Sequence, residues 1–99
     1  MKKVKPIAAR NARELAKALG LTPADGLEIE IRSDLNDKII EVVNKRELTH
    51  AQVAKLANTS RTRITAILNR NTHAVSTDLM LRVIASLGVQ AKLQFKKAA

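Results

Sequence analysis

The sequence predicts an all-α domain of five helices that ends in a single β-strand. Apolar residues recur every three or four positions in several segments, and residues that favour helix starts precede these segments. The last segment instead alternates strictly between apolar and polar residues, which is the pattern of a strand with one buried face. A chain of 99 residues has the length of one domain, so we treat residues 1–99 as a single folding unit.

Composition excludes several classes of protein. Apolar residues make up 45% of the chain and Phe95 is its only aromatic residue, so we expect a modest aliphatic core. With no cysteine and only two histidines, we expect no disulfide, no structural zinc and no other cofactor. No apolar run approaches the roughly 20 residues that span a bilayer, and none follows the basic first residues as in a secretory signal. We therefore expect a cytoplasmic protein without a membrane partner.

Positive charge is concentrated in the second half of the chain, whose formal net charge overall is +9. Residues 1–47 hold 10 of the 18 basic residues and 8 of the 9 acidic ones, a net charge of +2. Residues 48–99 hold the other 8 basic residues and only Asp78, a net charge of +7. This distribution predicts a polyanionic partner for the second half.

Residues 1–21 are predicted to form a basic tail and a short helix. Small apolar side chains recur on one face from Ala8 to Leu19, and Gly20 suits the position just after a helix. This face consists mostly of methyl groups and buries little area. We therefore expect the helix to dock weakly, or to be ordered fully only against a partner.

A long helix is predicted from Pro23 to about Arg46, and it opens a helical core over residues 23–88. Thr22 can cap this helix, proline suits its first position, and Asp25 lies near its positive end. Its predicted buried stripe comprises Leu27, Ile31, Leu35, Ile39 and Val42, widened by Ile40 and Val43.

The first part of this helix has an alternative. Gly26 weakens a helix by about 1 kcal/mol relative to alanine, and residues 27–32 alternate as a strand would. On that interpretation a shorter helix starts at Ser33 or Asp34.

Two short helices joined by a tight turn follow, and they carry the clearest functional pattern. Thr49 caps the first helix, His50 to Ala57, and Ser60 caps the second, Arg61 to about Asn69. Asn58 takes the turn, because asparagine tolerates the left-handed backbone conformation better than most residues. The residues predicted to point inward are Val53, Leu56, Ile64, Ile67 and Leu68, with Ala54 where the two helices cross.

A fifth helix follows a polar loop over residues 69–75. Ser76 or Thr77 caps it, Asp78 lies in its first turn, and Gly88 ends it. Its predicted buried face comprises Met80, Val83, Ile84 and Leu87.

Residues 89–97 are predicted to form a strand that makes the protein a homodimer. An isolated strand leaves its backbone groups unpaired, so we expect it to pair with its own copy across a two-fold axis. The alternative is pairing with Leu27–Ile31 of the same chain. The predicted dimer contacts lie on one face of the strand and are Val89, Ala91, Leu93 and Phe95.

The spacing of the two caps leaves the start of the second short helix facing outward, and this end is predicted to read DNA. Arginine is the commonest reader of guanine in the major groove, so Arg61 and Arg63 are the expected base contacts. His50 and Gln52 open the preceding helix, where free N–H groups attract phosphate. Thr65 lies one turn further on, within reach of a phosphate or a thymine methyl, and the residues after the helix would grip the backbone. The predicted DNA-binding residues are His50, Gln52, Ser60, Arg61, Thr62, Arg63, Thr65, Arg70 and Asn71.

This pattern resembles the Xre/Cro/CI helix-turn-helix proteins, and among them the small antitoxins of the host-inhibition-of-growth type. The likeness covers nearly residues 15–97, and its central segments are Leu48-Thr49-His50, Gln52, Val53-Ala54, Ala57-Asn58 and Ser60 to Thr65. The departures are His50 for the usual glutamine, Asn58 for glycine, Thr59 for an apolar residue, and no glycine at Asn69-Arg70. The resemblance implies a lambda-repressor-like fold and a DNA-binding regulator that often represses its own operon. Some members of this family also bind a small toxin protein.

The function we favour is a dimeric, sequence-specific regulator of transcription that binds a double-stranded DNA operator, and we expect it to repress its own operon. The alternative is an antitoxin of a type II toxin–antitoxin pair that also neutralises a toxin by direct binding. A non-specific nucleic-acid packer is disfavoured by the ordered helix pair and by the near absence of aromatic residues for base stacking. An enzyme fits least, because no nucleophile elbow, phosphate loop or carboxylate pair is present and Ser60 serves as a cap.

Overall fold

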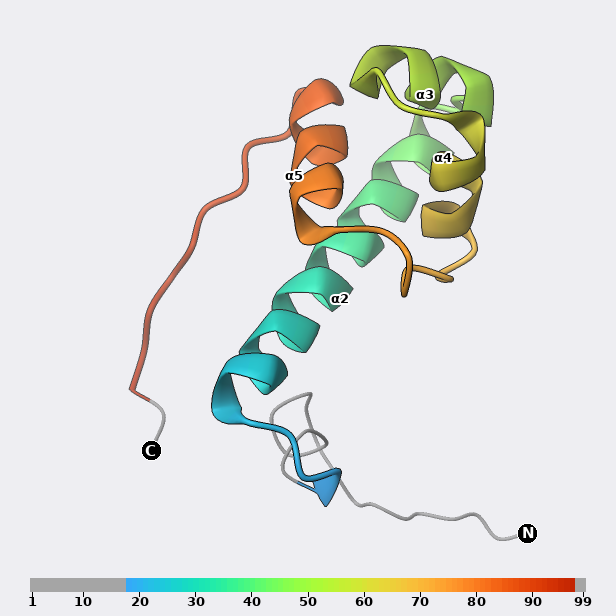
Figure 1. Cartoon of the computed structure of the whole chain (residues 1–99). Helices are drawn as coiled ribbons and strands as arrows, with labels where there is room; N and C mark the ends of the chain where they lie inside the picture. The colour runs from blue at the N-terminus through green and yellow to red at the C-terminus, as the bar shows by residue number, and fades with distance from the viewer. Residues whose placement is uncertain (1–17, 98–99) are drawn as a thin grey trace, which may run out of the picture.

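The computed structural model describes residues 18–97, which form four α-helices and no β-strand (Figure 1). The helices are α2 (Pro23–Lys45), α3 (His50–Ala57), α4 (Arg61–Leu68) and α5 (Thr77–Ser86). The predicted all-α class is confirmed for this part of the chain. The basic tail and the predicted helix over residues 8–19 lie outside the described residues, apart from the last positions of that helix, so a count of five helices is not established.

The long helix α2 begins directly after a capping box. The hydroxyl of Thr22 accepts a hydrogen bond from the Asp25 backbone N–H at 3.1 Å, and the Asp25 carboxylate accepts one from the Thr22 N–H at 3.1 Å. The predicted long helix is therefore confirmed. The alternatives, a strand over residues 27–32 or a shorter helix from Ser33, are wrong, because the capped start outweighs the local alternation and the cost of Gly26.

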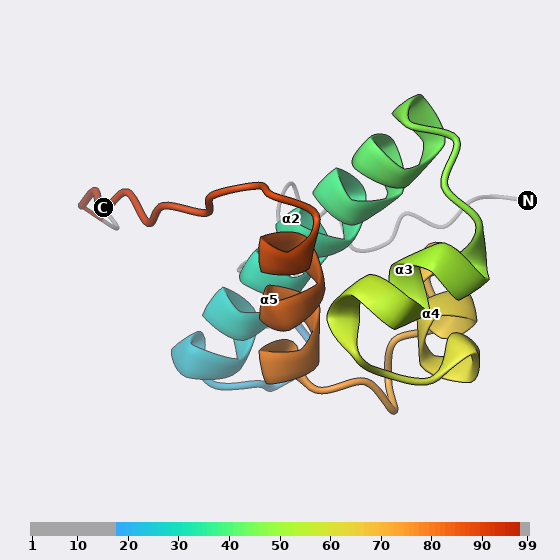
Figure 2. The same ribbon diagram turned by 90° about the horizontal axis from the view of Figure 1, so that it is seen from above.

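The other three helices pack around the C-terminal half of α2, and the N-terminal half of α2 extends past them (Figure 1). Helix α5 lies on one side of α2 and α4 on the other, while α3 contacts both α4 and α5 (Figure 2). After α5 the chain runs along the outside of the molecule toward the level of the start of α2 (Figure 1). The helix pair α3–α4 thus lies beside the C-terminal end of the long helix α2.

Aliphatic side chains form one core where the four helices meet. The largest fully buried side chains are Ile39, Val53, Ile64, Ile67, Met80, Val83 and Leu87. The predicted burial of two residues is wrong, because the side chains of Leu27 and Leu56 are 56% and 54% exposed. Leu27 belongs to the first turns of α2 (Pro23–Lys45), at the end of the helix that extends past the other described helices (Figure 1). Leu56 faces solvent because α3 turns the side that carries Val53, Ala54 and Ala57 toward the core.

Arginine side chains fasten loops to the helices. The guanidinium of Arg32 donates to the carbonyl oxygens of Thr72 at 2.7 Å and Val75 at 2.6 Å, in the loop before α5. The guanidinium of Arg46 donates to the carbonyl oxygen of Leu87 at 2.7 Å, where α5 ends. Hydrogen bonds from a charged donor are stronger than neutral ones, so they hold the loop and the end of α5 against α2.

The predicted C-terminal strand is not present in the single chain. Residues 89–97 have no regular secondary structure, and the side chains of Leu93 and Phe95 are 70% and 88% exposed. The physical reason is that a strand needs a hydrogen-bonding neighbour, and the described part of one chain offers none. The proposed neighbour within the chain, Leu27–Ile31, belongs to α2, so that alternative is wrong.

Candidate nucleic-acid interface

Helices α3 and α4 form a helix-turn-helix whose geometry is set by local caps. At the start of α3, Thr49 and Gln52 form a capping box with hydrogen bonds of 2.7 and 3.0 Å. Asn58 ends α3 in the left-handed conformation, with φ 55° and ψ 52°. The hydroxyl of Ser60 then accepts a hydrogen bond from the Arg63 N–H at 3.2 Å and starts α4. The predicted caps and turn are confirmed, and both helices have the predicted bounds to within one residue.

The start of α4 is anchored to the core on one side and exposed on the other. Ile64 and Ile67 are 0% exposed and fix the helix in place. All of residues 60–63 are exposed. The first turn of a helix has free N–H groups and a partial positive charge, to which Arg61 and Arg63 add their own. The arrangement presents a positive, polar helix end to solvent, as the sequence predicted.

Three of the predicted DNA contacts have structural partners in the protein itself. The Nδ1 atom of His50 lies 2.8 Å from the hydroxyl oxygen of Thr65, which joins the start of α3 to the middle of α4. The amide oxygen of Gln52 accepts the Thr49 N–H in the capping box. Of the side-chain amide, the box uses only that oxygen, so the NH₂ group of the exposed Gln52 is still available as a hydrogen-bond donor.

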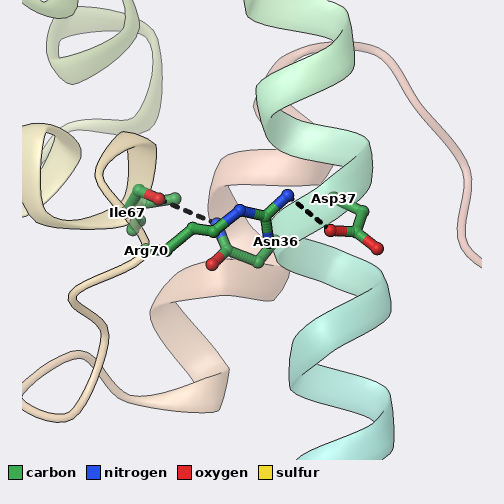
Figure 3. Close-up of polar contacts among 4 residues, drawn as sticks. All are labelled: Asn36, Asp37, Ile67 and Arg70. Carbon is green, nitrogen blue, oxygen red and sulfur yellow. Dashed lines mark hydrogen bonds and ion pairs between the residues drawn. The ribbon is translucent and has the colours of Figure 1, made fainter. Parts of the chain in front are cut away.

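Arg70 lies at the far end of α4, where φ is 60°. Its Nη2 atom is 2.7 Å from Oδ1 of Asp37 on α2, and both side chains are more than half exposed. Beside this ion pair, the amide nitrogen of Asn36 donates to the Ile67 carbonyl oxygen at 2.8 Å (Figure 3). An eight-residue helix is about 12 Å long, so the structure does not bring Arg70 and the neighbouring Asn71 together with the residues at the start of α4.

Arg82 on α5 braces the turn and was missed by the sequence analysis. Its Nε atom donates to the Ala57 carbonyl oxygen at 3.0 Å, and its Nη2 atom donates to the Asn58 carbonyl oxygen at 3.4 Å. A positive side chain at the carboxyl end of a helix satisfies its last carbonyl groups and its dipole. The only signal in the sequence is one arginine in the fifth predicted helix, which does not reveal the contact.

Thr59, inside the turn, is a second feature that the sequence did not explain. Its hydroxyl oxygen is buried and has no hydrogen-bond partner in the described part of the chain. This is a position where the proteins that the chain resembles carry an apolar residue. The hydroxyl therefore weakens the turn, because a buried polar atom without a partner costs stability.

Residues 18–97 contain neither a candidate membrane span nor a candidate metal site. No helix there combines the length and the apolar character that a bilayer crossing requires. No three side chains of histidine, aspartate or glutamate gather closely enough there to hold a metal ion.

A capped helix-turn-helix with a positive, exposed second helix is the arrangement of a DNA-binding protein. A family of helix-turn-helix domains matches residues 15–96, most of the chain, and the chain belongs to this family. No curated protein and no solved structure matches the chain. The resemblance is thus confirmed for helix-turn-helix proteins as a class, whereas the Xre/Cro/CI branch and the antitoxin type stay predictions.

Proposed function

We propose that this protein is a sequence-specific regulator of transcription that binds double-stranded DNA as a homodimer and represses its own operon. The observation that carries the proposal is the exposed start of α4, where Ser60, Arg61, Thr62 and Arg63 follow one another and Ile64 anchors the helix. The family match supports DNA as the partner. A regulator of transcription acts where the DNA is, so the cytoplasmic location predicted from the sequence is part of this proposal.

Each side chain at the start of α4 has a chemical role in this proposal. Arg61 and Arg63 read guanine, since each guanidinium can donate two hydrogen bonds to O6 and N7 of one base. Such a contact discriminates against the wrong base by about 1–3 kcal/mol. The oxygen of Ser60 already accepts the Arg63 N–H, so its O–H group is free to donate to a phosphate.

A second reading helix is needed because one helix of eight residues contacts only a few base pairs. A two-fold dimer supplies it and places the centres of the two half-sites about 34 Å apart, or a multiple of that distance. The exposed Leu93 and Phe95 at the end of the chain support dimerisation, since exposed apolar groups of this kind mark interaction surfaces.

Selection of DNA from a random pool tests sequence-specific binding. We expect a palindromic site, because each subunit would read one half. Arg61→Ala and Arg63→Ala are each expected to weaken binding to the selected site about 10-fold or more and to flatten the preference for it. Lys45→Ala removes the same charge from the end of α2 and serves as the control. Equal affinity for the selected site and a shuffled one, at about 150 mM salt, would falsify sequence-specific reading.

Repression is tested separately with a reporter gene placed behind the promoter of this protein's own gene. We expect the protein to lower reporter expression and the Arg61→Ala variant to restore it. An increase in expression with the wild-type protein would identify an activator instead.

An antitoxin is the second candidate, and three exposed leucines favour it. Leu19, Leu21 and Leu27, at the N-terminal end of α2, are 62%, 40% and 56% exposed. Exposed apolar side chains mark protein interaction surfaces, and the resemblance implies a small toxin as the partner. Co-purification with a protein encoded by the adjacent gene, and its loss in Leu27→Asp or on deletion of residues 1–20, would support this function. A complex that survives both changes would place the contact elsewhere.

We also propose that the protein is not an enzyme. The two side chains most suited to nucleophilic chemistry near the helix-turn-helix have other partners. The hydroxyl of Ser60 caps α4, and the His50 ring forms a hydrogen bond with the Thr65 hydroxyl. Turnover of a hydrolase substrate panel that is lost in Ser60→Ala would contradict this proposal.

A further inference from the structure

A groove of about 480 Å³ lies between α2, α5 and the C-terminal segment, residues 89–97. Its walls are mainly aliphatic. Ile31 and Leu35 come from α2, Leu81 and Ile84 come from α5, and the first part of the C-terminal segment, residues 89–93, closes it from outside. This part of the C-terminal segment therefore lies across from α2 and α5 with space between them.

The C-terminal segment lacks two things that a second copy would supply. It has no strand neighbour within residues 18–97, and after Val89, whose N–H donates to the Ile84 carbonyl oxygen at 3.2 Å, its backbone groups bond to no other backbone group of that range. Phe95, the only aromatic residue of the chain, is 88% exposed, and Leu93 is 70% exposed. In an extended segment Phe95 would share one face with Val89, Ala91 and Leu93, because alternate residues of an extended chain lie on the same face.

We propose that this groove binds the C-terminal segment of a second copy of the chain. The two segments pair antiparallel across a two-fold axis, and the apolar face of the resulting ribbon covers α2 and α5 of both copies. The proposal rests on the homodimer of the proposed function and names the surface that makes it.

The sequence of the segment selects one pairing register. Centring the axis on Leu93 places Ala91 opposite the partner's Phe95, so the smallest side chain of the face lies against the largest. It also sets Lys92 opposite the partner's Gln94. Centring on Lys92 instead would place two lysines directly opposite each other, and like charges there are destabilising. Because Ala91 lines the groove, the favoured register seats the partner's Phe95 in it.

Charge is complementary as well. The C-terminal segment carries three lysines and no acidic residue. At the groove, Lys38 already has a partner, Glu41, at 3.2 Å. The exposed residue Asp34 also lines the groove, and its carboxylate can pair with an incoming lysine. A basic, extended segment therefore fits this groove better than an acidic one.

Analytical ultracentrifugation of the full chain without DNA tests the interface from both sides. Phe95→Ser changes the segment and Leu81→Ser changes the groove, while Gln94→Ser, on the opposite face of the segment, is the matched control. We expect a wild-type dimer, a dissociation constant at least tenfold higher for Phe95→Ser and Leu81→Ser, and no change for Gln94→Ser. Helix content by circular dichroism checks that each variant remains folded.

A single cysteine tests the register, because the chain has no cysteine of its own. Residues opposite each other in antiparallel strands have Cα atoms about 4.5–5.5 Å apart, within the range of roughly 4.4–6.8 Å that a disulfide spans. Leu93→Cys would face its own copy, so we expect rapid cross-linking of the dimer under mild oxidation. Gln94→Cys would lie opposite the partner's Lys92 and diagonal to its own copy, at roughly 7–8 Å, so it is expected to cross-link at least tenfold more slowly.

The outcomes separate this inference from the proposed function. A wild-type monomer, a dimer that Phe95→Ser leaves intact, or equal cross-linking at the two cysteine positions would overturn the inference. Loss of binding to a neighbouring gene's product in Phe95→Ser, with the dimer intact, would assign the groove to that protein instead. A dimer that behaves as expected but shows no DNA sequence preference would retain the interface and refute the regulator.

Discussion

Replacing Asn36 with aspartate tests how α2 holds the recognition helix. Asn36 is 5% exposed, and its amide nitrogen donates to the Ile67 carbonyl oxygen at 2.8 Å. Aspartate has nearly the same shape, but an ionised carboxylate can only accept hydrogen bonds. The substitution therefore places two acceptor oxygens against each other in a buried site, within the contact that joins α2 to α4 (Figure 3).

The expected loss of stability depends on pH. Losing the hydrogen bond costs about 1 kcal/mol once the carboxyl is ionised, and a buried carboxylate without a partner costs roughly 3–5 kcal/mol more. The protonated carboxyl present at low pH can still donate its O–H to the Ile67 carbonyl oxygen. Burial raises the pKa of the introduced carboxyl above its usual range, whereas in the unfolded chain it ionises near pH 4. The folded state then binds more protons than the unfolded state, so stability falls as the pH rises from about 4 to 7. The two costs add to about 4 kcal/mol or more, so at about 4–8 °C per kcal/mol the variant's Tm at pH 7 drops by roughly 16 °C or more relative to the wild type.

Thermal denaturation followed by circular dichroism measures this effect, since the chain has no tyrosine or tryptophan to follow by fluorescence. Asn36→Leu is the control, because the Ile67 carbonyl oxygen still accepts the Arg70 N–H at 3.0 Å. It is expected to cost about 1 kcal/mol equally at both pH values. If Asn36→Asp lowers the Tm by the same amount at pH 4 and pH 7, the assigned donor role of Asn36 is wrong.

Three further substitutions test contacts around the helix-turn-helix. Asp37→Asn frees the guanidinium of Arg70, 2.7 Å away, and is expected to tighten DNA binding a few-fold and to steepen its salt dependence by about one released ion. Glu41→Gln removes the same charge elsewhere on α2, and an equal effect of both variants would exclude a specific role for the ion pair. Thr59→Val removes the buried, unpaired hydroxyl and is expected to raise the free energy of unfolding by about 1 kcal/mol, so an unchanged or lower Tm would contradict it. Asn58→Gly relieves the left-handed conformation at φ 55° and is expected to add about 0.5 kcal/mol in the same denaturation measurement, whereas a loss would show that asparagine is not strained there.

The helix-turn-helix was predictable because its signals are local. Thr49 bonds to the backbone three residues ahead, and Ser60 does the same, so each cap can be recognised without knowledge of the fold. The turn at Asn58 likewise depends on the conformational tolerance of one residue. For these reasons both short helices begin where the sequence placed them.

Features that depend on distant parts of the chain were not predictable in the same way. Periodicity placed Leu27 and Leu56 on apolar faces but could not tell which stretch of a face another helix covers. The contacts of Arg82 with the turn and of Arg70 with Asp37 join residues far apart in the sequence, and no spacing rule connects them. The alternating C-terminal segment indicated a strand, but a strand requires a neighbour, which residues 18–97 of one chain do not supply.

The bond between Arg46 and the Leu87 carbonyl oxygen, at 2.7 Å, fastens the exit of the C-terminal segment to the end of α2. If the C-terminal segments hold two subunits together, this hydrogen bond fixes the angle between the subunits, because the segment cannot swing freely about the end of α5. One base pair inserted between two half-sites rotates one of them by about 34° around the DNA axis. Two subunits held at a fixed angle cannot follow that rotation. The dimer would therefore discriminate between operators by the length of the spacer between the half-sites as well as by their base sequence.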